Sequence, residues 1–214
     1  MSSPTPSLTE RRKAATRMEI ARAAAGLFVK QGLRATRAED IAQAAGIAPR
    51  TFYRYFATKE EAVAPLYEAG ARRWTEAVAA APAELPVPQA LEHAVRHTLT
   101  PGAGVSAASW ELVRTLIRLT ETSPALGKVW AEVCRASEGV LAEVLVGRSR
   151  DGLDNVGKEA AGVRFAAAVA GAAVRVAVER WAADTAPAGG PKGPAALALR
   201  NLAALRAFPW AELV

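Results

Sequence analysis

Apolar residues recur along most of the chain at the three- and four-residue spacing of one helix face. In the first such segment, residues 8–31, this stripe consists of Ile20, Ala23, Ala24, Leu27 and Phe28. Further segments with helical patterning cover residues 36–45, 49–56, 58–80, 89–99, 106–120, 124–147, 157–184 and 193–207. Gly and Pro separate them, and no stretch alternates apolar and polar residues as a strand does. The pattern predicts an all-α protein of about nine helices.

Short polar side chains mark where several of these helices begin. Three Ser or Thr residues each stand three positions before a Glu, as in a capping box: Ser7, Thr36 and Thr58. Pro49 suits the first turn of the third helix. Gly46 separates the second and third helices, and it predicts a tight turn with a positive φ. Two short helices joined in this way are the pattern of a helix-turn-helix.

The third helix divides into two faces. Phe52 and Phe56 are four residues apart and are expected to pack onto Ile41 and the first helix. The other face carries Arg50, Thr51 and Arg54, with Tyr53 and Tyr55 beside it. Arg, Thr and Tyr side chains are those that contact bases and phosphates in a DNA groove. The alternative is a packed helical hairpin with ordinary surface arginines.

Charge is distributed unevenly along the 214 residues. Residues 1–61 contain 11 basic and 6 acidic residues, a net charge of +5, whereas residues 62–214 contain 16 and 15. A basic segment beside a neutral one indicates a polyanion partner for the first part only, unless the charges are simply solvated. Four early basic residues either contact flanking phosphates or lie in solvent: Arg11, Arg12, Lys13 and Arg17.

Residues from about 13 to 63 resemble the DNA-binding domain of the TetR family of regulators. The matching pieces are DIA at residues 40–42, AGI at residues 45–47, and the highly specific run TFYRYFATKE at residues 51–60. The resemblance implies a helix-turn-helix DNA-binding domain at residues 8–57 and a helical ligand-binding and dimerisation domain at residues 58–214. Ala48 departs from the pattern, because relatives commonly carry a capping Ser or Thr there.

The resemblance also implies roles for individual residues. The third helix enters the major groove, so Arg50, Thr51 and Arg54 are expected to face bases. Positions near phosphates are Tyr53, Tyr55 and Lys59, and the start of the second helix contributes Thr36 and Arg37. Because Glu39 can only accept hydrogen bonds, it is not included among the DNA contacts.

The last two helices of the pattern are expected to join two copies of the chain. Residues 159–185 are rich in Ala and Gly, which allow close helix approach either at an oligomer interface or within a tight intrachain core. The last helix carries an apolar set that consists of Leu197, Leu199, Leu202 and Leu205. The resemblance favours a homodimer through this pair of helices, with two DNA readers about one helical turn apart.

The resemblance further implies a pocket between residues 62 and 185 for a small amphipathic or hydrophobic ligand. Its candidate residues are Trp74, Trp110, Arg114, Arg118, Trp130, Cys134 and Phe165. For each aromatic residue the alternative is ordinary core packing. Arg114 and Arg118 either receive a carboxylate or phosphate tail, such as that of an acyl-CoA, or form a solvated pair.

Several other classes of function lack a sequence basis. No apolar stretch is expected to span a membrane, because Arg164 and Arg175 interrupt the most apolar segment, and the N-terminus has no apolar signal core. We therefore expect a cytoplasmic protein without a membrane partner. His93 and His97 are four residues apart but lack a third histidine, so no metal, cofactor or catalytic set is expected.

The sequence thus predicts a ligand-responsive repressor that leaves a pseudo-palindromic operator when a small molecule binds. Two alternatives stay open. A non-specific DNA-binding or architectural protein would bind in a salt-dependent but sequence-independent way. An enzyme that uses the C-terminal pocket would have to turn over the pocket ligand.

Overall fold

The computed structural model describes residues 7–102, 106–148 and 156–213, and these residues form helices and their connections, without strands. The elements are α1 (Leu8–Gln31), α2 (Ala38–Ala44), α3 (Pro49–Tyr55), the 3-10 helix η1 (Glu61–Val63), α4 (Ala64–Ala80), α5 (Val87–Leu99), α6 (Ala107–Thr122), α7 (Pro124–Arg148), α8 (Val156–Ala183), α9 (Pro194–Ala204) and α10 (Trp210–Leu213). The all-α prediction is confirmed for the described part of the chain. The four-residue α10 and the 3-10 helix η1 were not predicted.

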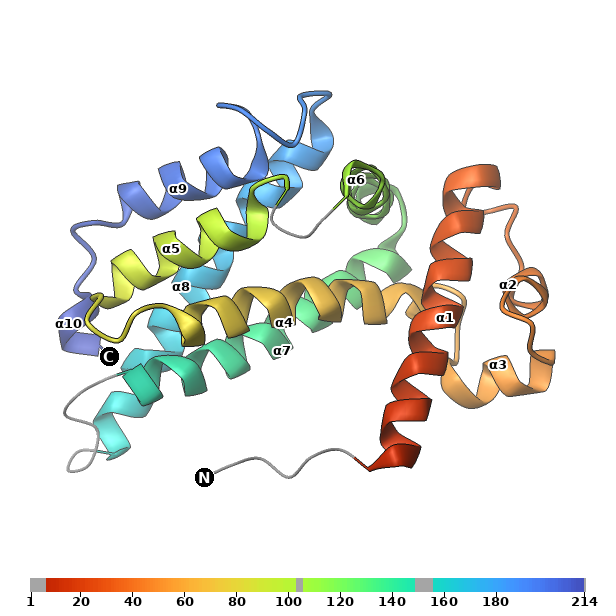
Figure 1. Cartoon of the computed structure of the whole chain (residues 1–214), viewed down its shortest axis with the longest axis horizontal. Helices are drawn as coiled ribbons and strands as arrows, with labels where there is room; N and C mark the ends of the chain where they lie inside the picture. Colours follow the sequence, from red (N-terminus) through yellow and green to blue (C-terminus); the bar gives the residue numbers. More distant parts are fainter. Residues whose placement is uncertain (1–6, 103–105, 149–155, 214) are drawn as a thin grey trace.

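The helices form two groups (Figure 1). Helices α1, α2 and α3 lie together at one end, and α4 runs from that end alongside α7 into the larger group. Helix α8 packs against α7, α9, α6 and α10, and α5 lies against α4 and α9. Helix α1 contacts η1, α4 and α6, so these three elements connect the two groups.

The first three helices begin and end close to where the sequence pattern places them. The Ser7 hydroxyl accepts from the Glu10 backbone N–H at 3.2 Å, and the Glu10 carboxylate accepts from the Ser7 backbone N–H at 2.8 Å. This capping box starts α1. Gly46 follows α2 with a φ of +68°, a conformation in which a Cβ would be strained, so the predicted turn is confirmed.

Helix α4 begins six residues later than the sequence pattern indicates. The Thr58 hydroxyl accepts from the Glu61 backbone N–H at 3.2 Å, but the Glu61 carboxylate accepts from the Ala57 backbone N–H at 3.0 Å. The chain then forms η1 before α4 starts at Ala64. Pro65 accounts for the break, because it has no N–H with which to continue a helix from residue 61. The expected single helix over residues 58–80 is therefore wrong in its first turns.

Small residues of α8 pack against other helices of the same chain. Ala166, Ala167 and Ala170 are fully buried, and Trp181 closes the same face of the helix. At Gly171 a Cβ would lie 3.0 Å from the Glu138 Cγ on α7, so the two helices approach closely there. The alternative of a tight intrachain core is thus correct for this face of α8.

Helix α8 is also a long apolar helix. By length and composition its residues Ala161–Ala183 are sufficient to cross a membrane, so the expectation that no segment reaches that length is wrong. Within the chain, however, this segment lies between α7 and α9 and buries Val163, Ala177 and Ala182. It is thereby the central helix of a helical core.

Candidate functional site

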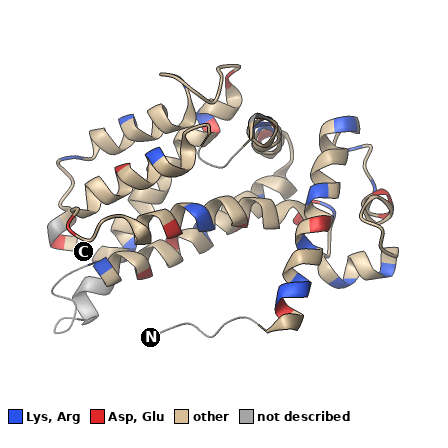
Figure 2. Cartoon of the chain, viewed as in Figure 1, with Lys and Arg blue, Asp and Glu red and all other residues tan. Residues whose placement is uncertain are grey.

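Helix α3 presents its polar face to solvent. Arg50 and Arg54 are exposed, Thr51 is half-buried, and Tyr53 is 52% exposed. Arg50 makes no hydrogen bond or ion pair with any residue that the structure describes, and the Arg54 guanidinium lies 5.6 Å from the centroid of the Tyr55 ring. Figure 2 shows several further Lys and Arg residues along α1. We call Arg50, Thr51, Tyr53, Arg54 and Tyr55 the reading surface.

Two phenylalanines anchor α3 from beneath. Phe52 is 0% exposed and Phe56 is almost as well buried, with their ring centroids 5.9 Å apart. Both belong to the hydrophobic core, α3 packs against α2, and Arg17 of α1 lies over the Phe56 ring. A fixed inner face determines which side chains α3 turns outward.

Arg17 does not extend toward DNA from the start of α1. Its guanidinium lies 5.1 Å from the Phe56 ring centroid and forms an ion pair with Glu68 of α4 at 3.7 Å. Arg17 therefore connects α1, the end of α3 and α4, which neither of its expected roles included. Sequence spacing gives no indication of this, because Glu68 belongs to a different helix.

Thr36 lies inside the protein rather than at its surface. It is 1% exposed, and its hydroxyl donates to the Gly32 carbonyl at 2.8 Å. The predicted contact of this side chain with the DNA backbone is therefore wrong, and so is its role as a cap. Arg37 occupies the N-cap position of α2, where its backbone N–H donates to the Asp40 carboxylate at 2.8 Å. The Arg37 side chain remains exposed.

Lys59 is oriented inward. Its Nζ donates to the carbonyls of Leu33 at 2.7 Å and Thr36 at 2.8 Å. The lysine thus ties the segment after α3 to the turn between α1 and α2. Its charge lies beside the reading surface, but its hydrogen bonds are made within the protein.

Glu39, which was left out of the predicted DNA contacts because it can only accept hydrogen bonds, lies next to the reading surface. The Tyr53 hydroxyl donates to its carboxylate at 3.4 Å, and the Arg37 Nε lies 3.6 Å from the same group. One carboxylate on α2 therefore orients a phenol on α3 and an arginine at the start of α2. DNA phosphates that approach these donors would compete with it.

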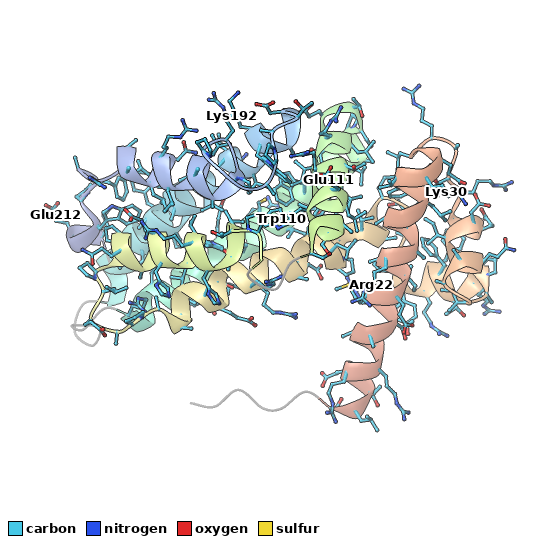
Figure 3. All side chains as sticks on the ribbon, turned by 45° about the horizontal axis from the view of Figure 1, so that its top comes forward. Arg22, Lys30, Trp110, Glu111, Lys192 and Glu212 are labelled. Carbon is cyan, nitrogen blue, oxygen red and sulfur yellow. The ribbon has the colours of Figure 1, made fainter. Side chains whose placement is uncertain are left out.

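A cavity of about 350 Å³ lies among α4, α6, α7 and α8. Four of the predicted ligand residues line it: Trp74, Trp110, Trp130 and Cys134. Figure 3 shows Trp110 on the side of α6 that faces the other helices, whereas Lys192 and Glu212 lie at the outer edges of the molecule. The lining also includes side chains that sequence reasoning missed, among them Tyr67, Arg73, Glu138 and Arg175.

Three predicted ligand residues are not part of this lining. Arg114 is 9% exposed, with its guanidinium 4.4 Å from the Trp181 ring centroid and in hydrogen-bond contact with the Ala186 carbonyl. Arg118, one turn further along α6, is exposed. Phe165 is 57% exposed and packs on Phe208 with ring centroids 5.5 Å apart. Their predicted place in the pocket is wrong, because helix rotation directs each of them elsewhere.

Burial governs the titration of the two groups in the lining whose pKa is shifted. It raises the pKa of the Cys134 thiol to about 12, while the nearby Arg175 lowers it in part. Burial also raises the pKa of the Tyr67 phenol. Both groups are therefore neutral near pH 7.

The histidine pair on α5 does not form a metal centre in the described ranges. The rings of His93 and His97 are stacked with centroids 6.5 Å apart. No group of three or more His, Cys, Asp or Glu side chains with metal-binding geometry occurs among the residues that the structure describes.

Comparisons with known proteins extend over most of the chain. The model of the family "Bacterial regulatory proteins, tetR family" matches residues 20–64. The chain is 32% identical over 178 residues to the HTH-type transcriptional regulator TcmR of Streptomyces glaucescens, a match that covers 82% of this chain and 77% of TcmR. The HTH-type transcriptional repressor KstR2 of Mycobacterium tuberculosis is 49% identical over 47 residues, which cover 22% of this chain and 24% of KstR2.

Solved structures share the fold. The structure of Thermus thermophilus FadR, a TetR-family transcriptional repressor in complex with lauroyl-CoA, aligns with a TM-score of 0.56 and 25% identity, over 88% of this chain and 92% of FadR. The repressor AlkX from a Dietzia strain aligns with a TM-score of 0.57 over 92% of this chain and 96% of its own, at 18% identity.

Proposed function

Since the chain belongs to the tetR family of bacterial regulatory proteins and is a helix-turn-helix transcriptional regulator, we propose that it is a cytoplasmic repressor. In this proposal it binds a pseudo-palindromic operator as a homodimer. It leaves the operator when a small molecule fills the cavity. The observation that carries this proposal is the two-sided α3, in which Phe52 is fully buried while Arg50 and Arg54 are exposed. The proposal assigns no catalytic role to the cavity.

The reading surface supplies the proposed base contacts. Arg50 and Arg54 each offer two parallel donors of the kind that recognise guanine, and Thr51 offers a methyl group and a hydroxyl. Tyr53, Tyr55 and Arg37 are assigned to phosphates. In this proposal α1 to α3 constitute the DNA-binding domain at residues 8–57, and the remainder forms the ligand-binding and dimerisation domain.

A face of α8 supports the proposed dimer. Phe165 and Val176 are large apolar residues that stay exposed in the single chain, and Val169 lies between them on the same side of the helix. A second copy of α8 and α9 would remove this apolar surface from water. Two-fold symmetry would then present two copies of α3 to successive turns of one DNA face.

Helices α4 and α6 support the proposed release. Tyr67 and Trp74 of α4 and Trp110 of α6 line the cavity, and both helices contact α1. A ligand that displaces either helix therefore changes the packing of the DNA-binding end. It lowers DNA affinity only if it binds the released state more tightly than the DNA-bound state.

Gel-shift titrations of the purified protein test the proposal. The probe is the DNA upstream of its own gene, measured at several salt concentrations and against an excess of unrelated DNA. We expect a dimer complex that persists against the unrelated DNA. Equal affinity for both DNAs with a steep salt dependence would instead identify the non-specific DNA-binding protein.

A further inference from the structure

Aromatic rings form much of the cavity wall. Tyr67 and Trp74 come from α4, Trp110 from α6 and Trp130 from α7. The Tyr67 and Trp130 rings meet edge to face with centroids 5.1 Å apart. Rings arranged in this way favour a flat aromatic guest, which gains offset-stacked and edge-to-face contacts in addition to its apolar burial.

Most polar side chains around these rings already have partners within the protein. The Tyr67 hydroxyl donates to the Leu116 carbonyl at 3.1 Å, and the Trp130 Nε1 donates to the Glu179 carboxylate at 2.7 Å. Arg175 pairs with the same carboxylate at 3.2 Å. These hydrogen bonds hold the side chains of the cavity wall in place. A ligand could bind to these groups only by breaking one of the bonds.

The Trp110 Nε1 is buried without a hydrogen-bond partner in the described parts of the chain, and two neighbouring residues of α7 also lack one. Ser137 and Glu138 line the cavity and are half-buried, and neither side chain makes a hydrogen bond or ion pair within the part of the chain that the structure describes. Glu138 lies along α8 at Gly171, and it is close enough to Cys134 to influence the pKa of that thiol. A carboxylate in this position accepts hydrogen bonds and repels anions.

The lining does not resemble a site for an acyl-CoA. The phosphates of coenzyme A require a cluster of basic groups. Here Arg175 is paired with Glu179, and Arg73 lies where the cavity adjoins a surface hollow lined by His93 and His97. Arg114 and Arg118 are outside the lining. The free carboxylate of Glu138 adds a negative charge.

We propose that the cavity binds a neutral, flat aromatic molecule whose hydroxyl group donates a hydrogen bond to Glu138, and that it excludes acyl-CoA and other anions. This inference rests on the proposed function, since it names the class of ligand for the same cavity. The aromatic rings supply the affinity for the ring system, and Glu138 supplies the preference for a hydroxyl at one end.

Calorimetry with small probes tests the inference on the full-length protein. The probes are 2-naphthol, its methyl ether 2-methoxynaphthalene, naphthalene-2-sulfonate and lauroyl-CoA. We expect 2-naphthol to bind about tenfold more tightly than the methyl ether, which cannot donate to a carboxylate. The two anions should bind at least about tenfold more weakly than 2-naphthol.

Two further measurements locate the site. Cys134 is the single cysteine of the chain and lies in the lining, so bound 2-naphthol should slow its alkylation by N-ethylmaleimide. Glu138→Met keeps the length of the side chain and removes both acceptor oxygens, so it should abolish the difference between 2-naphthol and its methyl ether. Glu143→Met, on the exposed side of the same helix, is the matched control and should retain that difference.

The inference is overturned if lauroyl-CoA or the sulfonate binds as tightly as 2-naphthol, if 2-naphthol does not bind or leaves Cys134 unprotected, or if Glu138→Met keeps the preference for the hydroxyl. Gel shifts with the same probes separate it from the proposed function. Binding of 2-naphthol without release of DNA would refute the release mechanism alone. Release by lauroyl-CoA would refute only the proposed ligand class.

Discussion

The Lys59 Nζ donates to the backbone carbonyl of Thr36 at 2.8 Å, and a second hydrogen bond to Leu33 makes this lysine the tie between the two ends of the helix-turn-helix. Lys59→Met keeps the aliphatic stem and removes both donors. We expect it to lower the free energy of unfolding by about 2 kcal/mol, because two carbonyls lose a charged partner. Thermal or urea unfolding measures the loss. Lys192→Met, on an exposed and distant lysine, should leave stability unchanged.

Arg50→Ala should weaken operator binding by about 1–3 kcal/mol and relax sequence preference at one base pair of each half-site. The side chain has no partner among the described residues, so folding stability should not change. Competition gel shifts with operators altered at single base pairs measure both effects. Arg206→Ala removes the same charge from an exposed position beyond α9 and serves as the control. Equal losses for both variants would exclude a base contact.

Gly46→Ala should destabilise the protein by about 1–2 kcal/mol, because the residue holds a φ of +68° in the turn between α2 and α3. The matched substitution is Gly26→Ala in the middle of α1, where an added Cβ would meet nothing within 4 Å. That variant should be more stable by up to about 1 kcal/mol. Urea unfolding measures the change in the free energy of unfolding for both variants. A lower stability in both would contradict the explanation.

Cys134 should react with thiol reagents unusually slowly near neutral pH. Burial raises its pKa from 9.0 to about 12, so its thiolate population still increases about tenfold per pH unit above pH 9, whereas that of an ordinary thiol levels off there. The folded state binds this proton more tightly than the unfolded chain does. The associated stability is therefore complete below pH 9 and declines as the pH rises toward 12. Alkylation rates from pH 7 to 10, with the urea-unfolded chain as reference, test this.

Phe165→Asp should convert the proposed dimer into monomers and thereby weaken operator binding. The residue is exposed on the face of α8 that also carries Val176, and a buried unpaired carboxylate would oppose association. Val140→Asp places the same charge on an exposed valine of α7, outside the proposed interface. Analytical ultracentrifugation should show monomers for the first variant and dimers for the second. Dimers of both would place the interface elsewhere.

Local chemistry in the sequence predicted those parts of the structure that depend on nearby residues. The capping box at Ser7, the turn at Gly46 and the inward spacing of Phe52 and Phe56 are each determined within a few residues of one another. The aromatic part of the cavity was predicted from the resemblance to the TetR family, which implied a pocket among these tryptophans. The late start of α4 follows from Pro65. It was not predicted, because the capping pattern at Thr58 indicated an earlier start of the helix.

Other features depend on where distant segments meet. Lys59 finds its acceptors 26 and 23 positions earlier in the chain, and Arg114 finds the Ala186 carbonyl 72 positions later. No spacing rule relates such residues. The outward direction of Phe165 depends on the rotation of α8 about its axis, and a helix made largely of alanine specifies that rotation weakly.

Among the described residues, none of the side chains that line the cavity belongs to the reading surface, and α1, η1, α4 and α6 connect the two sets. Substitutions around Glu138 can therefore alter which compound is sensed while the operator stays the same. Substitutions on α3 can redirect the protein to other genes without changing the compound to which it responds. The fold thus allows the signal and the target to evolve independently.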